Sequence, residues 1–78
     1  MEIYLKKLLF KASHRGTKEM DIILGSFAEK NLETMNEENL KLFEEILEIP
    51  DPDLYKWFTS EDVSIPEKYI ALVKEISK

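Results

Sequence analysis

Residues 14–30, HRGTKEMDIILGSFAEK, place a charged turn directly before an amphipathic helix, and this combination decides the fold. The helix is predicted over residues 17–30, where apolar residues recur at three- and four-residue spacing on one face. That face consists of Met20, Ile23, Leu24, Phe27 and Ala28. Gly25 lies beside it, and a glycine within a helix costs about 1 kcal/mol relative to alanine. We therefore expect another helix to pass close to Gly25.

The residues before this segment form a second helical pattern. Over residues 3–13 an apolar stripe appears at helical spacing, made of Leu5, Leu8, Leu9 and Ala12. Tyr4 and Phe10 lie off this stripe. We therefore expect the first helix to be covered on more than one side, and both aromatic residues are candidates for surface contacts.

Two further helices are predicted in the middle of the chain. Asn36 is a suitable N-cap residue for a third helix, which should stop before Pro50 because the residue ahead of a proline disfavours the helical conformation. In the following DPD sequence, Asp51 is predicted to be an N-cap and Pro52 the first residue of a fourth helix. The faces expected to be buried are Leu40, Phe43, Ile46 and Leu47 in the third helix, and Leu54, Trp57 and Phe58 in the fourth.

A polar loop is expected over residues 59–65, and Pro66 opens a last helix with Tyr69, Val73 and Ile76 turned inward. Sustained alternation of polar and apolar residues is absent, so no strand is predicted. The sequence thus predicts an all-α fold, a compact bundle of five short helices with residues 1–78 as a single domain.

The charge is unevenly distributed along the chain. The formal net charge is −5, yet basic side chains crowd the first quarter, at Lys6, Lys7, Lys11, His14, Arg15 and Lys18. An acidic protein is a poor general binder of nucleic acid, whose affinity depends on lysine and arginine at phosphates. Such polarity is suited to steering a protein partner.

Several classes of protein are disfavoured by composition. The chain has no Cys and one His, so it lacks a disulfide, a thiolate metal site and a cysteine–histidine pair. Neither a calcium-binding loop nor a glycine-rich phosphate loop is present. No apolar run approaches the ~20 residues of a membrane span, and the first residues do not read as a signal peptide. We expect a soluble, mature protein that is not an enzyme and does not insert into membranes.

The charged segment at residues 14–21 has a structural interpretation. Gly16 offers the backbone freedom needed where the first helix ends, and His14 and Arg15 lie at the negative end of that helix. Glu19 is placed to reach back to the Gly16 N–H, as in half of a capping box, and Asp21 lies in the early, positive part of the next helix. Every residue of the segment is thus explained by a turn.

The same segment also has a functional interpretation, because a turn does not need so many charged residues on one corner. Arginine offers a planar fork to the carboxylates or carbonyls of a partner, and a neighbouring glycine lets a partner backbone come close. Nearby acids would hold the arginine in place. The candidate partner-binding residues are His14, Arg15, Gly16, Lys18, Glu19 and Asp21.

Two blocks of the sequence resemble a known family. The first is R-G-x-x-E-x-D followed by L-x-x-F, and the second is F-x-x-L-L followed by D-P-D-L-x-x-W, where Ile46 and Leu47 fill the L-L positions. In this order, over about residues 8–58, they resemble the small succinate dehydrogenase assembly factors, of the SdhE type in bacteria and assembly factor 2 in mitochondria. The residues concerned are Arg15, Gly16, Glu19, Asp21, Leu24 and Phe27, then Phe43, Ile46, Leu47, Asp51, Pro52, Asp53, Leu54 and Trp57.

The resemblance implies a five-helix monomeric chaperone. Its partner would be the flavoprotein subunit of succinate dehydrogenase, or in some bacteria of fumarate reductase, on which it promotes covalent attachment of FAD. FAD would act on the partner, with no cofactor stably bound here. Arg15, Gly16 and Glu19 would bind that subunit, with Asp21 in support. His14 departs from the family, since many bacterial members have a second arginine there. The location implied is the bacterial cytoplasm, or the mitochondrial matrix in a eukaryote.

Three other functions remain open at this point. Relatives of the family have been described as the antitoxin of a toxin–antitoxin pair, and a carrier of free flavin would share the same composition. A helical protein-interaction module with an unrelated partner is the third. An antitoxin would rescue cells from a co-expressed toxin, and a flavin carrier would quench the fluorescence of FAD. For a module with an unrelated partner, substitution of Arg15 or Gly16 would leave flavinylation unchanged.

Overall fold

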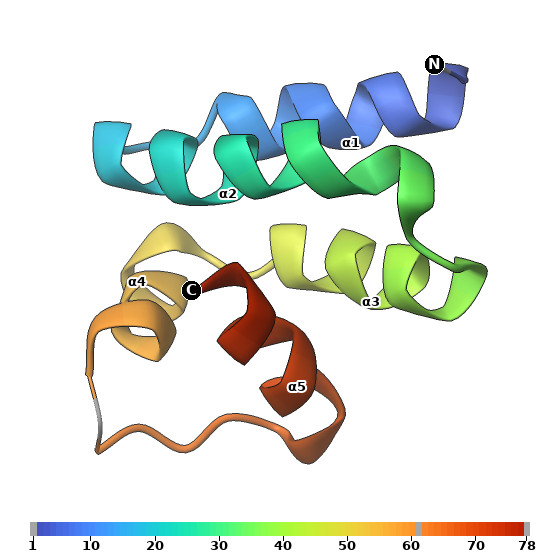
Figure 1. The fold of residues 1–78 in the computed structure, drawn as a ribbon. Helices are drawn as coiled ribbons and strands as arrows, with labels where there is room; N and C mark the ends of the chain where they lie inside the picture. The colour runs from blue at the N-terminus through green and yellow to red at the C-terminus, as the bar shows by residue number, and fades with distance from the viewer. Residues whose placement is uncertain (1, 61, 78) are drawn as a thin grey trace.

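A computed structural model describes residues 2–60 and 62–77; Met1, Glu61 and Lys78, which the predicted domain and loop include, lie outside the described residues. Within the described part the chain forms five α-helices and one short 3₁₀ turn, with no strand (Figure 1). The all-α prediction is confirmed. The elements are α1 (Ile3–Ser13), α2 (Lys18–Asn31), η1 (Leu32–Thr34), α3 (Glu37–Leu47), α4 (Asp51–Thr59) and α5 (Glu67–Ile76).

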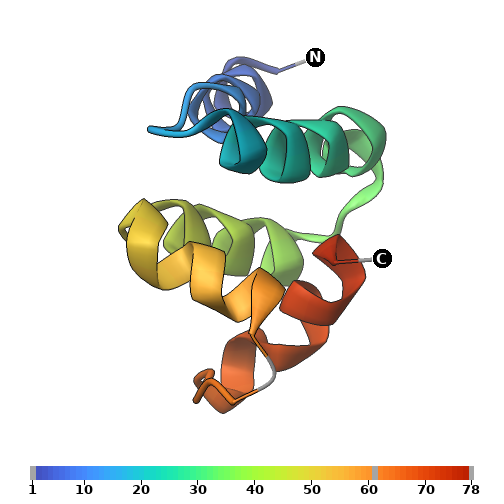
Figure 2. The ribbon, with the colours of Figure 1, turned by 90° about the vertical axis from the view of Figure 1, so that its left-hand side faces the viewer.

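The helices form two layers. Helices α1 and α2 lie side by side and antiparallel, and α3, α4 and α5 form the layer beneath them (Figures 1 and 2). The apolar core lies between the layers and draws on all five helices. Its fully buried large side chains are Leu8, Met20, Leu24, Leu32, Phe43, Ile46 and Leu54.

Gly25 lies where α1 and α2 approach each other, as the sequence predicts. A Cβ atom at Gly25 would lie 2.9 Å from the Ser13 Oγ and 3.3 Å from the Ser13 Cα. Because the second of these contacts is to backbone, a larger side chain would have to push the two helices apart. The glycine therefore sets the distance between the helices of the upper layer.

The predicted helix starts are confirmed in two cases and wrong in one. Asn36 caps α3, since its Oδ1 accepts a hydrogen bond from the Asn39 N–H at 2.8 Å, and Pro66 directly precedes α5. Asp51 is instead the first residue of α4, with Pro50 in the N-cap position, and makes no capping hydrogen bond. The reason is that its carboxylate is bound by residues of the α1–α2 connection.

The predicted inner faces are largely confirmed. Their residues are buried to different degrees, which the periodicity of the sequence does not show. Ile23, Phe27, Leu40, Trp57 and Phe58 are only partly buried and pack against the edge of the core. The Trp57 ring lies 5.9 Å from that of Tyr69, between centroids. These side chains close the sides of the two-layer sandwich.

A polar cluster joins α3 to α5 and predicts a pH dependence of stability. The Tyr69 hydroxyl donates to Glu45 at 2.7 Å, and the Lys68 ammonium pairs with the same carboxylate at 3.0 Å. The Tyr69 hydrogen bond and then the Lys68 contacts hold the pKa of Glu45 below its ordinary 4.5, whereas the hydrogen bond to Glu45 raises the pKa of Tyr69 and of Lys68.

The contribution of Glu45 is therefore present above its unfolded-state pKa and is lost as the pH falls through the lowered folded-state value. The contributions of Tyr69 and Lys68 are present at neutral pH and are lost only as the pH rises through their raised values. We expect Glu45→Gln to lose less stability than the wild type between about pH 5 and pH 3, measured by urea unfolding. Equal losses in the two proteins would contradict this assignment.

Candidate functional site

The α1–α2 connection and the α3–α4 connection lie at the same end of the molecule (Figure 1). Arg15 of the first connection bonds to residues at and after the end of α3. Its Nε donates to Asp51 Oδ1 at 2.7 Å, its Nη2 to the Ile49 carbonyl at 2.6 Å, and its Nη1 to the Leu47 carbonyl. The Arg15 side chain is only 10% exposed. The planar guanidinium thus binds one carboxylate and two carbonyls within its own chain.

This arrangement is explained by the end of α3. Leu47 is its last residue, and the final carbonyls of a helix lack partners inside the helix and carry partial negative charge. The positively charged Arg15 guanidinium donates hydrogen bonds to carbonyl oxygens there and attracts the nearby Asp51 carboxylate. The sequence suggested that the planar guanidinium of Arg15 would bind a partner, but its donors are used inside the protein. The structure therefore assigns Arg15 the role of holding the two connections together. A direct contact between Arg15 and a partner stays a prediction.

Gly16 has a different role from the one expected. The described residues contain no glycine with positive φ, so Gly16 does not end α1 by a left-handed backbone conformation. Its N–H instead donates to Asp51 Oδ2 at 2.5 Å, and a Cβ atom would lie only 2.6 Å from that oxygen. Gly16 is required here because the Asp51 carboxylate approaches the backbone so closely.

The remaining charged residues divide into supporting and exposed groups. Asp21 supports the corner as expected, because its Oδ1 accepts a hydrogen bond from the Arg15 N–H. Thr17 is the N-cap of α2 and accepts from the Met20 N–H at 3.3 Å. The predicted capping bond from Glu19 to the Gly16 N–H is wrong, because Asp51 occupies that donor.

Lys18 and Glu19 lie on the first turn of α2 and are exposed, and their side chains make no hydrogen bond or ion pair with any described residue. His14 is also exposed, and its ring stacks on Phe10 with centroids 4.0 Å apart and planes at 17°. The corner therefore presents a cation, an acid and an imidazole on a braced backbone. We call residues 14–21 together with Asp51 the braced corner.

Two open hollows flank the contact between Gly16 and Asp51. One has a volume of about 370 Å³ and is lined by Phe10, Lys11, His14, Arg15, Gly16, Leu47, Glu48 and Asp51. The other has a volume of about 490 Å³, is mostly apolar, and is lined by Gly16, Thr17, Glu19, Asp51, Pro52 and Tyr55. Gly16 and Asp51 therefore line both hollows.

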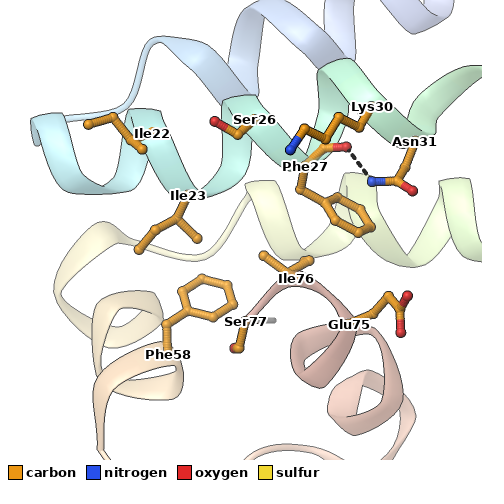
Figure 3. A pocket seen from close by; sticks show the side chains of 10 residues that line it. All are labelled: Ile22, Ile23, Ser26, Phe27, Lys30, Asn31, Phe58, Glu75, Ile76 and Ser77. Atoms are coloured by element: carbon orange, nitrogen blue, oxygen red, sulfur yellow. Dashed lines mark hydrogen bonds between the residues drawn. The ribbon is translucent and has the colours of Figure 1, made fainter.

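A third hollow, of about 360 Å³, opens between the layers and is lined by none of the residues of the braced corner (Figure 3). Ile22 and Ile23 of α2 lie above it and Phe58 of α4 lies below, and the Asn31 side chain donates to the Phe27 carbonyl at 2.9 Å. It brings together none of the predicted site residues, and the sequence had given no indication of it.

Asp51 is the site residue whose role was not predicted. Its acidic side chain and the following proline explain a helix start equally well, so the local sequence did not indicate a contact with Arg15 and Gly16. The one signal available was that the two blocks, at residues 15–27 and 43–57, occur together in the resemblance. Within the described residues, no group of three His, Asp or Glu side chains is placed to hold a metal ion.

The fold and the braced corner define a small all-α domain whose candidate site is an open surface rather than an enclosed catalytic cavity. Residues 6–78 match the family described as flavinator of succinate dehydrogenase, and the chain belongs to this family. The prediction of the family from its two sequence blocks is confirmed.

Relatives from bacteria and eukaryotes support this assignment. The chain is 46% identical over 63 residues to the FAD assembly factor SdhE of Acetobacter pasteurianus, covering 81% of this chain and 57% of that protein. It is 38% identical over 64 residues to the mitochondrial succinate dehydrogenase assembly factor 2 of Dictyostelium discoideum, covering 82% and 45%. The chain thus spans about half the length of these relatives. No helix in the described part is long and apolar enough to cross a membrane.

Proposed function

We propose that this chain binds the flavoprotein subunit of succinate dehydrogenase, or of fumarate reductase, and promotes covalent attachment of FAD to that subunit. The family match over residues 6–78 is the observation that carries the proposal. The two relatives described above are both assembly factors by name, which favours this function over the antitoxin alternative.

In this proposal the chain positions its partner and does no chemistry of its own. FAD and the residues of the flavoprotein supply the reacting groups, and the chain holds no cofactor stably. Holding reacting groups in a productive arrangement lowers the entropic part of a barrier, so a binding protein of this kind accelerates a reaction without acid–base groups. A monomer that binds one flavoprotein subunit is sufficient for this role.

The braced corner is the proposed contact surface. Lys18, Glu19 and His14 are exposed, and only His14 has a side-chain contact within the described chain, its stacking on Phe10, so these three are the side chains offered to the partner. Gly16 is the exposed backbone position at which the partner would make contact, and Arg15 with Asp21 and Asp51 holds the loop in place. Because its relatives include bacterial and mitochondrial proteins, we place the function in the bacterial cytoplasm or the mitochondrial matrix.

The direct test is a pull-down of the purified flavoprotein subunit with this chain, followed by in-gel detection of covalently bound flavin. We expect complex formation and more covalent flavin when the chain is present. The same amount of covalent flavin with and without the chain would refute the proposal. Titration of free FAD tests the carrier alternative, for which quenching of flavin fluorescence is required.

Glu19→Gln is the sharpest variant for the contact surface, because it removes the charge and keeps the size of the side chain. Since Glu19 is exposed and makes no bond to a described residue, we expect unchanged helicity and a melting temperature within about 2 °C of the wild type. We expect flavoprotein binding to weaken by about tenfold or more. Glu29→Gln, an exposed substitution at the other end of α2, is the matched control. Equal binding by the two variants would remove Glu19 from the site.

A further inference from the structure

Helix α1 has a second face that the protein itself leaves uncovered. Ile3, Lys7, Phe10 and His14 follow helical spacing and lie on the side opposite the buried Leu8 and Ala12. Ile3 is 75% exposed and Phe10 is 63% exposed. The sequence predicts that α1 is covered on more than one side. At these residues that prediction is wrong for the described chain, because no part of it covers them. We call Ile3, Lys7, Phe10, Lys11 and His14 the outer face of α1.

The aromatic part of this face is already ordered. The Phe10 and His14 rings stack nearly parallel, and the His14 Nδ1 lies 2.9 Å from the Phe10 carbonyl oxygen. Each ring therefore restricts the other although both are exposed. Binding to ordered aromatic side chains costs little side-chain entropy, which is one reason aromatic residues dominate the energetics of protein interfaces.

The charge of the helix indicates what would cover this face. Between residues 3 and 13 the helix contains Lys6, Lys7 and Lys11 and no acid, in a protein whose net charge is −5. All three lysines are exposed, and none forms an ion pair with a described residue. Glu48, which directly follows α3, lines the same hollow as Lys11. The outer face is therefore basic and apolar, complementary to an acidic surface that presents an apolar side chain.

This face is continuous with the braced corner. Phe10, Lys11 and His14 line the same hollow of about 370 Å³ as Arg15 and Gly16. A partner bound at the corner would thus reach the outer face without a gap. Continuity favours one large interface over two separate binding sites, because interfaces of stable complexes extend well beyond a single loop.

We propose that the outer face of α1 is a second contact surface for the same flavoprotein partner, and that it takes an acidic segment with an apolar side chain. The apolar side chain would rest on Phe10 and Ile3, and carboxylates would pair with Lys7 and Lys11. This inference rests on the proposed function, because it assigns a further surface to the same partner.

The test measures the dissociation constant of the purified flavoprotein complex for three variants of the full chain. Phe10→Ala is expected to raise the dissociation constant about tenfold or more. The double variant Lys7→Gln and Lys11→Gln is expected to weaken binding at low salt and to reduce the dependence of binding on salt. Ile22→Ala removes an exposed apolar side chain from α2, 57% exposed and outside the proposed interface, and should bind within about twofold of the wild type.

The outcomes separate this inference from the proposed function. Wild-type affinity in Phe10→Ala, while Glu19→Gln binds weakly, would refute the role of α1 and leave the proposed function standing. A wild-type chain that does not bind the flavoprotein overturns both. If Phe10→Ala lowers the melting temperature, the lysine variant decides: an unchanged dissociation constant and salt dependence refute the inference, and a reduced dependence supports it.

Discussion

Arg15→Ala is expected to lower the free energy of unfolding by about 2–4 kcal/mol, and the melting temperature by roughly 10–20 °C. The substitution removes three hydrogen bonds from a charged donor to Asp51, Leu47 and Ile49. It also leaves without their partner a largely buried carboxylate, the carbonyl of the last residue of α3 and a carbonyl of the α3–α4 connection, which costs more than the bonds themselves contribute. Circular dichroism during thermal and urea unfolding measures the effect.

Arg15→Lys separates charge from geometry in the same assay. Lysine keeps the positive charge but lacks the planar fork, so we expect a loss between those of the wild type and Arg15→Ala. An Arg15→Ala protein that is as stable as the wild type and yet fails to bind the flavoprotein would contradict the bracing role. Arg15 would then be a surface contact, as the sequence alone suggested.

Gly25→Leu is expected to destabilise the protein by about 3 kcal/mol, because the added side chain meets the Ser13 backbone of the neighbouring helix. The loss outweighs the gain of about 1 kcal/mol that glycine replacement brings within a helix. Glu29→Leu places the same residue at an exposed position of α2 and should change stability by no more than about 0.5 kcal/mol.

A double substitution tests the geometry of this contact. Gly25→Ala places a Cβ atom 2.9 Å from the Ser13 Oγ, and Ser13→Ala removes that oxygen. In the Gly25→Ala background, Ser13→Ala should therefore be less destabilising than in the wild type, or should be stabilising. Additive effects in urea unfolding would show that α1 and α2 do not pack as described.

The helices were predictable because their signals are local. In α2 the spacing of the apolar residues from Met20 to Ala28 indicates a helix with one buried face. Asn36 and Pro66 mark helix starts through interactions with residues next to them in the sequence. The close contact at Gly25 was also predictable, since a glycine within an otherwise good helix needs a packing reason. The location of the candidate site followed from the charges gathered around Gly16.

Which of those charges are held inside the protein and which are exposed was decided by the tertiary structure alone. Arg15 and Asp51 are 36 residues apart in the sequence, and each has a sufficient local explanation, one as a cation at a helix end and the other as a helix cap. Folding brings the end of α3 beside the α1–α2 connection, where its carbonyls and Asp51 take the guanidinium inward. The exposed fraction of a side chain depends on such distant neighbours. The sequence therefore indicated a charged turn, and the fold decided which of its side chains are held inside the protein and which remain exposed.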